Sequence, residues 1–91
     1  MKKAATDREH LRLRRIQGQV SGIEKMILEQ RTCSDVVIQI RAVTAALKSL
    51  EASVLERHVK ISLKDAMDSR DPGLKSAKIA ELSSLYERFI N

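Results

Sequence analysis

Apolar residues recur three or four positions apart along most of this chain, which is the spacing of helices with one hydrophobic face. The clearest case is a stretch without Gly or Pro at residues 33–58, CSDVVIQIRAVTAALKSLEASVLERH. Its apolar positions follow steps of four and three, at Val36, Ile40, Val43, Leu47, Leu50 and Val54. Because this is the seam period of packed helices, the stretch predicts one long helix over about residues 33–67.

A similar apolar stripe occupies the N-terminal third of the chain. It comprises Leu13, Ile16, Val20, Ile23 and Ile27 and predicts a helix over about residues 6–30. Thr6 and Glu9 have the spacing of a capping box, which places the start of this helix at Thr6.

Short polar segments separate the predicted helices. Residues 30–32 form a link in which Thr32 caps the long helix, with Asp35 near its third position. A link this short makes the first two helices antiparallel neighbours. Residues 68–73, DSRDPG, end the long helix, and a third helix follows over about 74–90. The third helix carries no obvious chemistry, so we expect it to cover an end of the bundle or to brace a subunit contact.

The pattern contains no strand-like alternation, so we predict an all-α fold: one domain, residues 1–91, with three helices and a long central one. Such a chain has few large side chains to bury, because aromatic residues make up 2% of it and Trp is absent. Below about 100 residues a lone core is often marginal, and oligomerisation is a common remedy. We therefore expect subunits that associate.

Composition excludes several classes of protein. A single Cys rules out an internal disulfide and fits a reducing, cytoplasmic location. No apolar run approaches the roughly 20 residues that span a bilayer, and the N-terminus MKKAATDREH lacks the apolar segment of a signal peptide. We also find no paired carboxylate motif and no nucleotide-binding loop, so we do not expect an enzyme.

Cys33 and His58 stand at opposite ends of the predicted seam. They are 25 residues apart, which is roughly 37 Å along a helix, and they return to nearly the same face. One copy cannot bring them together, whereas two antiparallel copies can if they cross between Ala45 and Ala46. Small side chains at residues 42–46 allow a close approach there. The sequence therefore suggests a symmetric dimer with two equivalent Cys33–His58 sites.

Each member of this pair can bind a metal ion. Cys33 opens a capped helix, where the dipole favours a thiolate, which is a soft metal ligand and a nucleophile. His58 supplies an imidazole, which binds metals or accepts protons. Taken singly, each could be an ordinary structural residue, and their common phase is what favours a site. His10 is more simply an exposed polar residue, although it could lend a further ligand.

Positive charge is concentrated at the N-terminus. The net charge is +5, and the first 15 residues hold six basic residues against two acidic ones: Lys2, Lys3, Arg8, Arg12, Arg14 and Arg15 against Asp7 and Glu9. The spacing puts Arg8, Arg12 and Arg15 on one helix face, and Arg14 points elsewhere. Such a face is either simply solvated or contacts phosphates, and in a symmetric oligomer it would repeat to match a two-fold DNA site.

Three segments resemble a known family. They are LRRIQGQV at 13–20, CSDVV at 33–37 followed by Gln39, Ile40, Ala42 and Val43, and VLERH at 54–58 with the 25-residue Cys-to-His interval. Over roughly residues 8–65 the chain resembles the copper-, nickel/cobalt- and formaldehyde-responsive repressors known as CsoR, RcnR and FrmR.

The resemblance implies both an assembly and a function. The implied assembly is a disc-like tetramer, a dimer of antiparallel dimers that each form a four-helix bundle. The implied function is a repressor that holds its operator and releases it when the Cys/His site is occupied. By position, Cys33 and the facing subunit's His58 are the sensing pair. Arg12 and Arg15 match basic residues with which the family binds operator DNA, and Gln17 belongs to the same sequence motif of the first helix.

The effector is the point at which this chain departs from parts of that family. Copper-type members carry a second Cys four residues after the His, and nickel/cobalt types carry a His, where this chain has Ser62. The remaining Cys/His pair most resembles the formaldehyde-responsive branch, in which a methylene group bridges the thiolate to an N-terminal amine. Met1, Lys2 or Lys3 would supply that amine, although the branch's usual N-terminal proline is absent. We therefore expect formaldehyde ahead of metal.

Two alternatives stay open. The first is the same repressor sensing Cu(I), Ni(II), Co(II) or Zn(II) through Cys33, His58 and a borrowed ligand such as His10. The second is a metal-binding or helical adaptor protein without a DNA role. The expected partners are double-stranded operator DNA, further copies of the chain and a small effector, without a membrane and without a required cofactor.

Overall fold

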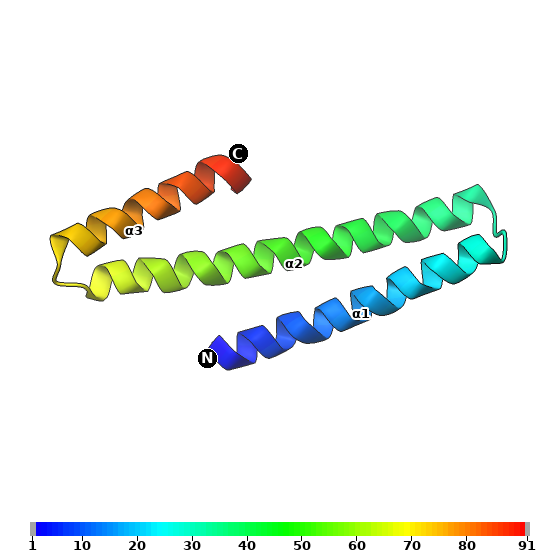
Figure 1. The fold of residues 1–91 in the computed structure, drawn as a ribbon, viewed down its shortest axis with the longest axis horizontal. Helices are drawn as coiled ribbons and strands as arrows, with labels where there is room; N and C mark the ends of the chain where they lie inside the picture. The colour runs from blue at the N-terminus through cyan, green and yellow to red at the C-terminus, as the bar shows by residue number, and fades with distance from the viewer. Residues whose placement is uncertain (1, 91) are drawn as a thin grey trace. The chain divides into compact units, whose positions relative to one another are not determined.

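The protein is all-α in a computed structural model that describes residues 2–90, with side chains described for residues 6–89. Its helices are α1 (Lys2–Leu28), α2 (Cys33–Asp68) and α3 (Pro72–Leu85), followed by a π-helical turn, η1 (Tyr86–Ile90) (Figure 1). No strand occurs among residues 2–90. The predicted three-helix subunit with a long central helix is therefore confirmed.

The chain divides into two compact units, Met1–Val54 and Leu55–Asn91, and the boundary falls within α2. The first unit contains α1 and the N-terminal part of α2. The second unit contains the C-terminal part of α2 together with α3 and η1.

The predicted start of the first helix is wrong. α1 begins at Lys2, four residues before Thr6, so Thr6 lies inside the helix and is not its N-cap. The reason is that residues 2–5, KKAA, are strong helix formers, and nothing among them stops the helix from extending.

The first helix also ends two residues earlier than predicted, at Leu28. Gln30 takes a left-handed backbone conformation with φ of 58°. The Gln30 N–H donates to the Ile27 carbonyl at 3.1 Å, and the Arg31 N–H donates to the Met26 carbonyl at 3.0 Å. These bonds close the last turn in the manner of a Schellman motif.

The start of α2 agrees with the prediction. The Asp35 N–H donates to Thr32 Oγ1 at 3.2 Å, and the Val36 N–H donates to the Thr32 carbonyl at 3.1 Å. Thr32 is therefore the N-cap that the sequence indicated. α3 starts at Pro72, because the Asp71 carboxylate accepts from the Gly73 N–H at 2.9 Å and a proline is tolerated at the first helical position.

In the first unit, α1 runs antiparallel to the N-terminal part of α2 (Figure 1). Ile16 of α1 and Val43 of α2 are its buried hydrophobic side chains among those described. In the second unit, Ala66 and Ser62 of α2 are buried among the side chains described.

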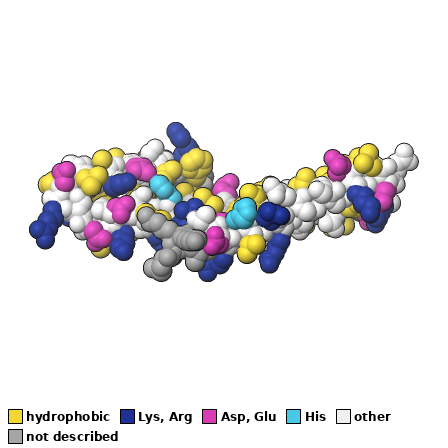
Figure 2. All heavy atoms as spheres, turned by 60° about the horizontal axis from the view of Figure 1, so that its bottom comes forward, with side chains coloured by type: hydrophobic (Ala, Val, Ile, Leu, Met, Phe, Trp, Pro, Cys, Tyr) yellow, Lys and Arg dark blue, Asp and Glu magenta, His cyan; other side chains and the backbone are white. Residues whose placement is uncertain are grey.

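Most of the predicted apolar stripe is not covered within one chain. Large hydrophobic side chains at least 40% exposed include Val20, Ile27, Ile40, Leu47 and Val54. Figure 2 shows hydrophobic side chains lying at the surface among charged ones on the face drawn. No helix within residues 2–90 is both long enough and apolar enough to cross a membrane.

Candidate functional site

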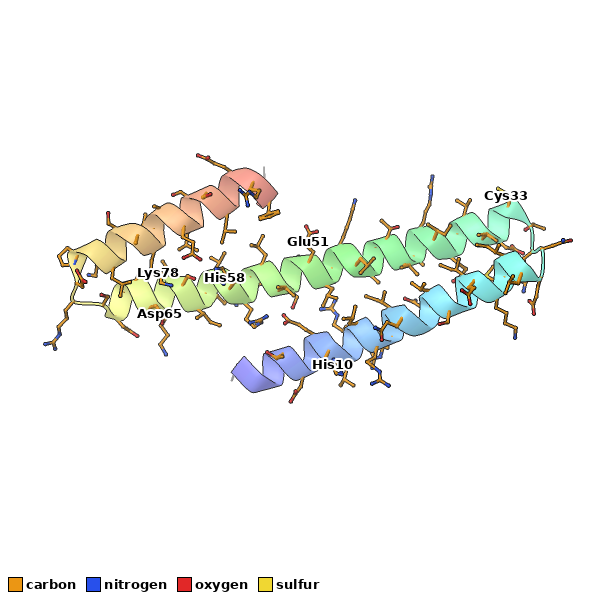
Figure 3. All side chains as sticks on the ribbon, in the orientation of Figure 1. His10, Cys33, Glu51, His58, Asp65 and Lys78 are labelled. Carbon is orange, nitrogen blue, oxygen red and sulfur yellow. The ribbon has the colours of Figure 1, made fainter. Side chains whose placement is uncertain are left out.

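Cys33 is the first residue of α2, and its thiol is free and exposed (Figure 3). The Thr32 cap holds the first turn of the helix at this point. The thiol thus sits at the positive end of the helix dipole and is open to an approaching metal ion or electrophile.

His58 lies 25 residues later in the same helix, within the second unit. Its Nε2 is 2.8 Å from Oε1 of Glu81, which belongs to α3. Because a carboxylate only accepts hydrogen bonds, the Nε2 atom carries the proton. In the neutral imidazole, Nδ1 is then the atom with a free lone pair, so Glu81 fixes both the ring's orientation and the nitrogen that can coordinate a metal.

Sequence reasoning missed Glu81, since the third helix was expected to have no chemistry. Glu81 lies 23 residues beyond His58 in the sequence. The turn that joins α2 to α3 reverses the chain, and this brings the two side chains into contact. Its other oxygen, Oε2, is 3.9 Å from the ammonium Nζ of Lys78. The carboxylate therefore interacts with a lysine as well as with the histidine, and it links α3 to the imidazole.

Ser62 occupies the next turn of α2 after His58 and is almost fully buried, with 2% of its surface exposed. Its Oγ lies 3.4 Å from His58 Nε2. The hydroxyl thus fills the position beside the histidine with a hard, neutral oxygen, which is a poor ligand for a soft metal ion.

The remaining predicted effector residues do not join this group. His10 lies on α1 and is exposed. Met1 lies outside the described residues, and the side chain of Lys2 is outside them as well. No cluster of three or more His, Cys, Asp or Glu side chains able to hold a metal ion occurs in the described part of one chain.

The predicted DNA-contacting residues differ in their surroundings. Arg8, Arg14, Arg15 and Gln17 on α1 are exposed. Arg12 is half-buried, and its Nη2 donates to Ser49 Oγ on α2 at 2.5 Å. Arg12 therefore differs from Arg8 and Arg15, which share its helix face, in its burial and in its bond to α2.

Relatives of this chain include characterised repressors. The chain is 42% identical to the copper-sensing transcriptional repressor RicR of Mycobacterium tuberculosis over 79 residues, covering 87% of this chain and 81% of RicR. It is 40% identical to the copper-sensing transcriptional repressor CsoR of Bacillus subtilis over 78 residues, covering 86% of this chain and 74% of CsoR. An uncharacterised Serratia marcescens protein is 44% identical over 79 residues, covering 87% of this chain and 85% of that protein.

No solved structure matches the chain. The family model described as "Metal-sensitive transcriptional repressor" matches residues 5–88, which include all three α-helices apart from the first three residues of α1. Because both this match and the two repressors span most of the chain, the chain belongs to the CsoR-like family of metal-sensitive transcriptional repressors.

Proposed function

We propose that this protein represses transcription by holding operator DNA and releases it when a metal ion occupies a Cys33–His58 site shared by two copies. The observation that carries the proposal is the Glu81–His58 bond, which fixes the imidazole and leaves Nδ1 as its coordinating atom. The family consists of repressors, so the protein is not an enzyme.

Copper is the metal we propose, as Cu(I). A thiolate is among the ligands that favour Cu(I), and the two named relatives are copper-sensing repressors. Cys33 and His58 supply one soft and one borderline donor, and Ser62 adds no third. Ni(II), Co(II) and Zn(II) remain in the test because imidazole suits all of them.

The relatives favour this metal-sensing alternative over formaldehyde, the effector that the sequence analysis placed first. The aldehyde mechanism requires an amine from Met1, Lys2 or Lys3 beside the thiolate. Formaldehyde is retained as a competing effector in the experiment, since Cys33 is exposed and nucleophilic chemistry is open to it.

The proposed assembly is the antiparallel dimer, paired again into a tetramer, of single-domain subunits spanning residues 1–91. The exposed apolar side chains of α2, such as Ile40, Leu47 and Val54, support it because they continue the predicted seam beyond buried Val43. A monomer that left this stripe in water would give up roughly 25 cal/mol for each Å² of apolar surface that another copy could cover.

The proposed DNA surface is the exposed basic part of α1, with Arg8, Arg14, Arg15 and Gln17. Phosphate contacts from arginines supply affinity that falls steeply with salt. We place this activity in the cytoplasm, where operator DNA and reduced thiols are found.

The test is fluorescence anisotropy of a labelled duplex from upstream of the protein's own gene, in low salt under anaerobic conditions. We expect the wild type to bind the duplex and Cu(I) to release it. Cys33→Ala and His58→Ala should bind DNA but resist release, whereas Ser62→Ala should respond as the wild type does because both donors remain.

Three outcomes would contradict parts of the proposal. Absence of binding at low salt would remove the DNA role of the basic surface. If metal released DNA from the Cys33→Ala protein as it does from the wild type, the thiol would not be part of the sensing site. Release by formaldehyde but by none of Cu(I), Ni(II), Co(II) and Zn(II) would return the aldehyde to first place.

A further inference from the structure

Two polar pairs connect α1 to α2 within the first unit. Arg12 Nη2 donates to Ser49 Oγ at 2.5 Å, and Ser53 Oγ donates to Glu9 Oε2 at 3.5 Å. From the first pair to the second, α1 steps back three residues while α2 advances four, as successive contacts of antiparallel helices do. We call these four residues the polar clasp.

The clasp lies where the register of the two helices is otherwise weakly fixed. The short connection after Leu28 sets the register at one end, but Arg12 is 16 residues before that end, or roughly 24 Å along the helix. Between them, Ile16 and Val43 are the buried hydrophobic side chains of this unit among those described. An apolar stripe repeating every three or four residues tolerates a slip of one turn, whereas paired polar groups specify one register.

Arg12 lies at the α2-facing edge of the helix face that also carries Arg8 and Arg15. Arg8 and Arg15 are seven residues apart, so they project within about 20° of one another. Arg12 lies about 40° from Arg8 and is four residues before buried Ile16, on the edge that faces α2. The hydrogen bond from its guanidinium is charge-assisted, and it commits Nη2 to Ser49 on α2.

We propose that Arg12 is a positioning residue: through Ser49 it fixes α1 on α2 so that Arg8 and Arg15 meet the DNA phosphates, and it makes no phosphate contact itself. The inference rests on the proposed DNA binding, and it gives Arg12 a role different from the phosphate contact proposed for Arg8 and Arg15. Ser49, an uncharged residue on another helix, becomes a determinant of DNA affinity.

Salt dependence of DNA binding separates a positioning arginine from a contacting one. Each phosphate contact adds about 0.9 to the slope of log affinity against log salt concentration. We expect Arg15→Gln to reduce this slope by about that amount for each contact it removes. Arg12→Gln and Ser49→Ala should weaken binding by about three- to tenfold with the slope unchanged, which is the range of one lost hydrogen bond.

The double variant Arg12→Gln with Ser49→Ala should bind no more weakly than either single variant, because both remove the same bond. Ser49→Thr, which keeps the hydroxyl, should restore most of the affinity. Ser21→Ala is the matched control, because Ser21 is an exposed serine within α1 and lies outside the clasp. The proposal is overturned if Ser49→Ala binds as the control does while Arg12→Gln lowers the slope as Arg15→Gln does.

Hydrogen exchange of the DNA-free protein tests the clasp independently of the proposed function. In Ser49→Ala we expect the amides of α1 before Ile16 to exchange faster than in Ser21→Ala, while the amides near Leu28 stay unchanged. Equal exchange in the two proteins would refute the clasp. If the wild type fails to bind any duplex at low salt but this exchange difference is found, the proposed function fails and the clasp as a helix-positioning contact stands.

Discussion

Replacing Glu81 by Gln tests the bond on which the proposed metal site depends. The substitution keeps the size and one acceptor oxygen of the side chain but removes its charge, so the Nε2–H of His58 loses a charge-assisted partner at 2.8 Å. Losing the partner of a metal-bound histidine typically lowers metal affinity by 10- to 100-fold.

The exposure of the pair places the expected loss at the lower end of that range. The side chains of His58 and Glu81 are 47% and 42% exposed, so solvent screens the interaction. We therefore expect about a tenfold loss of Cu(I) affinity, equivalent to about 1.4 kcal/mol. For the same reason the unfolding free energy of the metal-free protein should change by less than about 1 kcal/mol.

A competition titration against a Cu(I) chelator of known affinity measures the first quantity, and urea unfolding of the metal-free protein measures the second. Glu87→Gln is the matched control, since it removes the same charge from an exposed residue of η1. Equal Cu(I) affinity in Glu81→Gln and the control would refute the reasoning. A loss of stability well above 1 kcal/mol would show instead that Glu81 holds the fold.

Three further changes test the fold and the assembly. Thr32→Ala removes the side-chain acceptor of the Asp35 N–H, and urea unfolding should show a loss of about 1 kcal/mol that Thr32→Ser largely avoids. Ile16→Val removes one methylene from a side chain 5% exposed and should lower the unfolding free energy by about 0.5–1.5 kcal/mol. Leu47→Glu puts a charge into the proposed seam at a side chain 45% exposed, so sedimentation should show smaller assemblies; unchanged mass would argue against that seam.

Much of the helical fold could be predicted because its signals are local. The spacing of apolar residues and the breaker cluster at residues 68–73 located the helices, although α3 begins at Pro72, inside that cluster. Thr32 marked the start of α2 correctly. The ends of α1 were harder to predict from the sequence. At the start, the predicted cap at Thr6 is preceded by strong helix formers, and the helix extends through them. At the end, the left-handed position that closes the helix is occupied by Gln30, whereas glycine is the usual residue there and would have marked the turn in the sequence.

The candidate site was predictable only where its residues share one helix. Cys33 and His58 both belong to α2, as the apolar spacing predicted, and their pairing between two copies stays a prediction. Glu81 cannot be found in this way, because its meeting with His58 depends on how the turn between α2 and α3 directs the third helix. Arg12 raises the same difficulty, since spacing places it beside Arg8 but cannot show that Ser49 accepts its hydrogen bond.

Burial of Ser62 beside His58 has a consequence for how sensors of this kind diverge. Serine and cysteine differ by one side-chain atom, and most serine codons lie a single base from a cysteine codon. At a buried position next to the imidazole, that one substitution replaces an oxygen by a slightly larger sulfur, and no other part of the chain has to move into the site. A point mutation can therefore change the ligand preference of such a protein while the surrounding helices keep their arrangement.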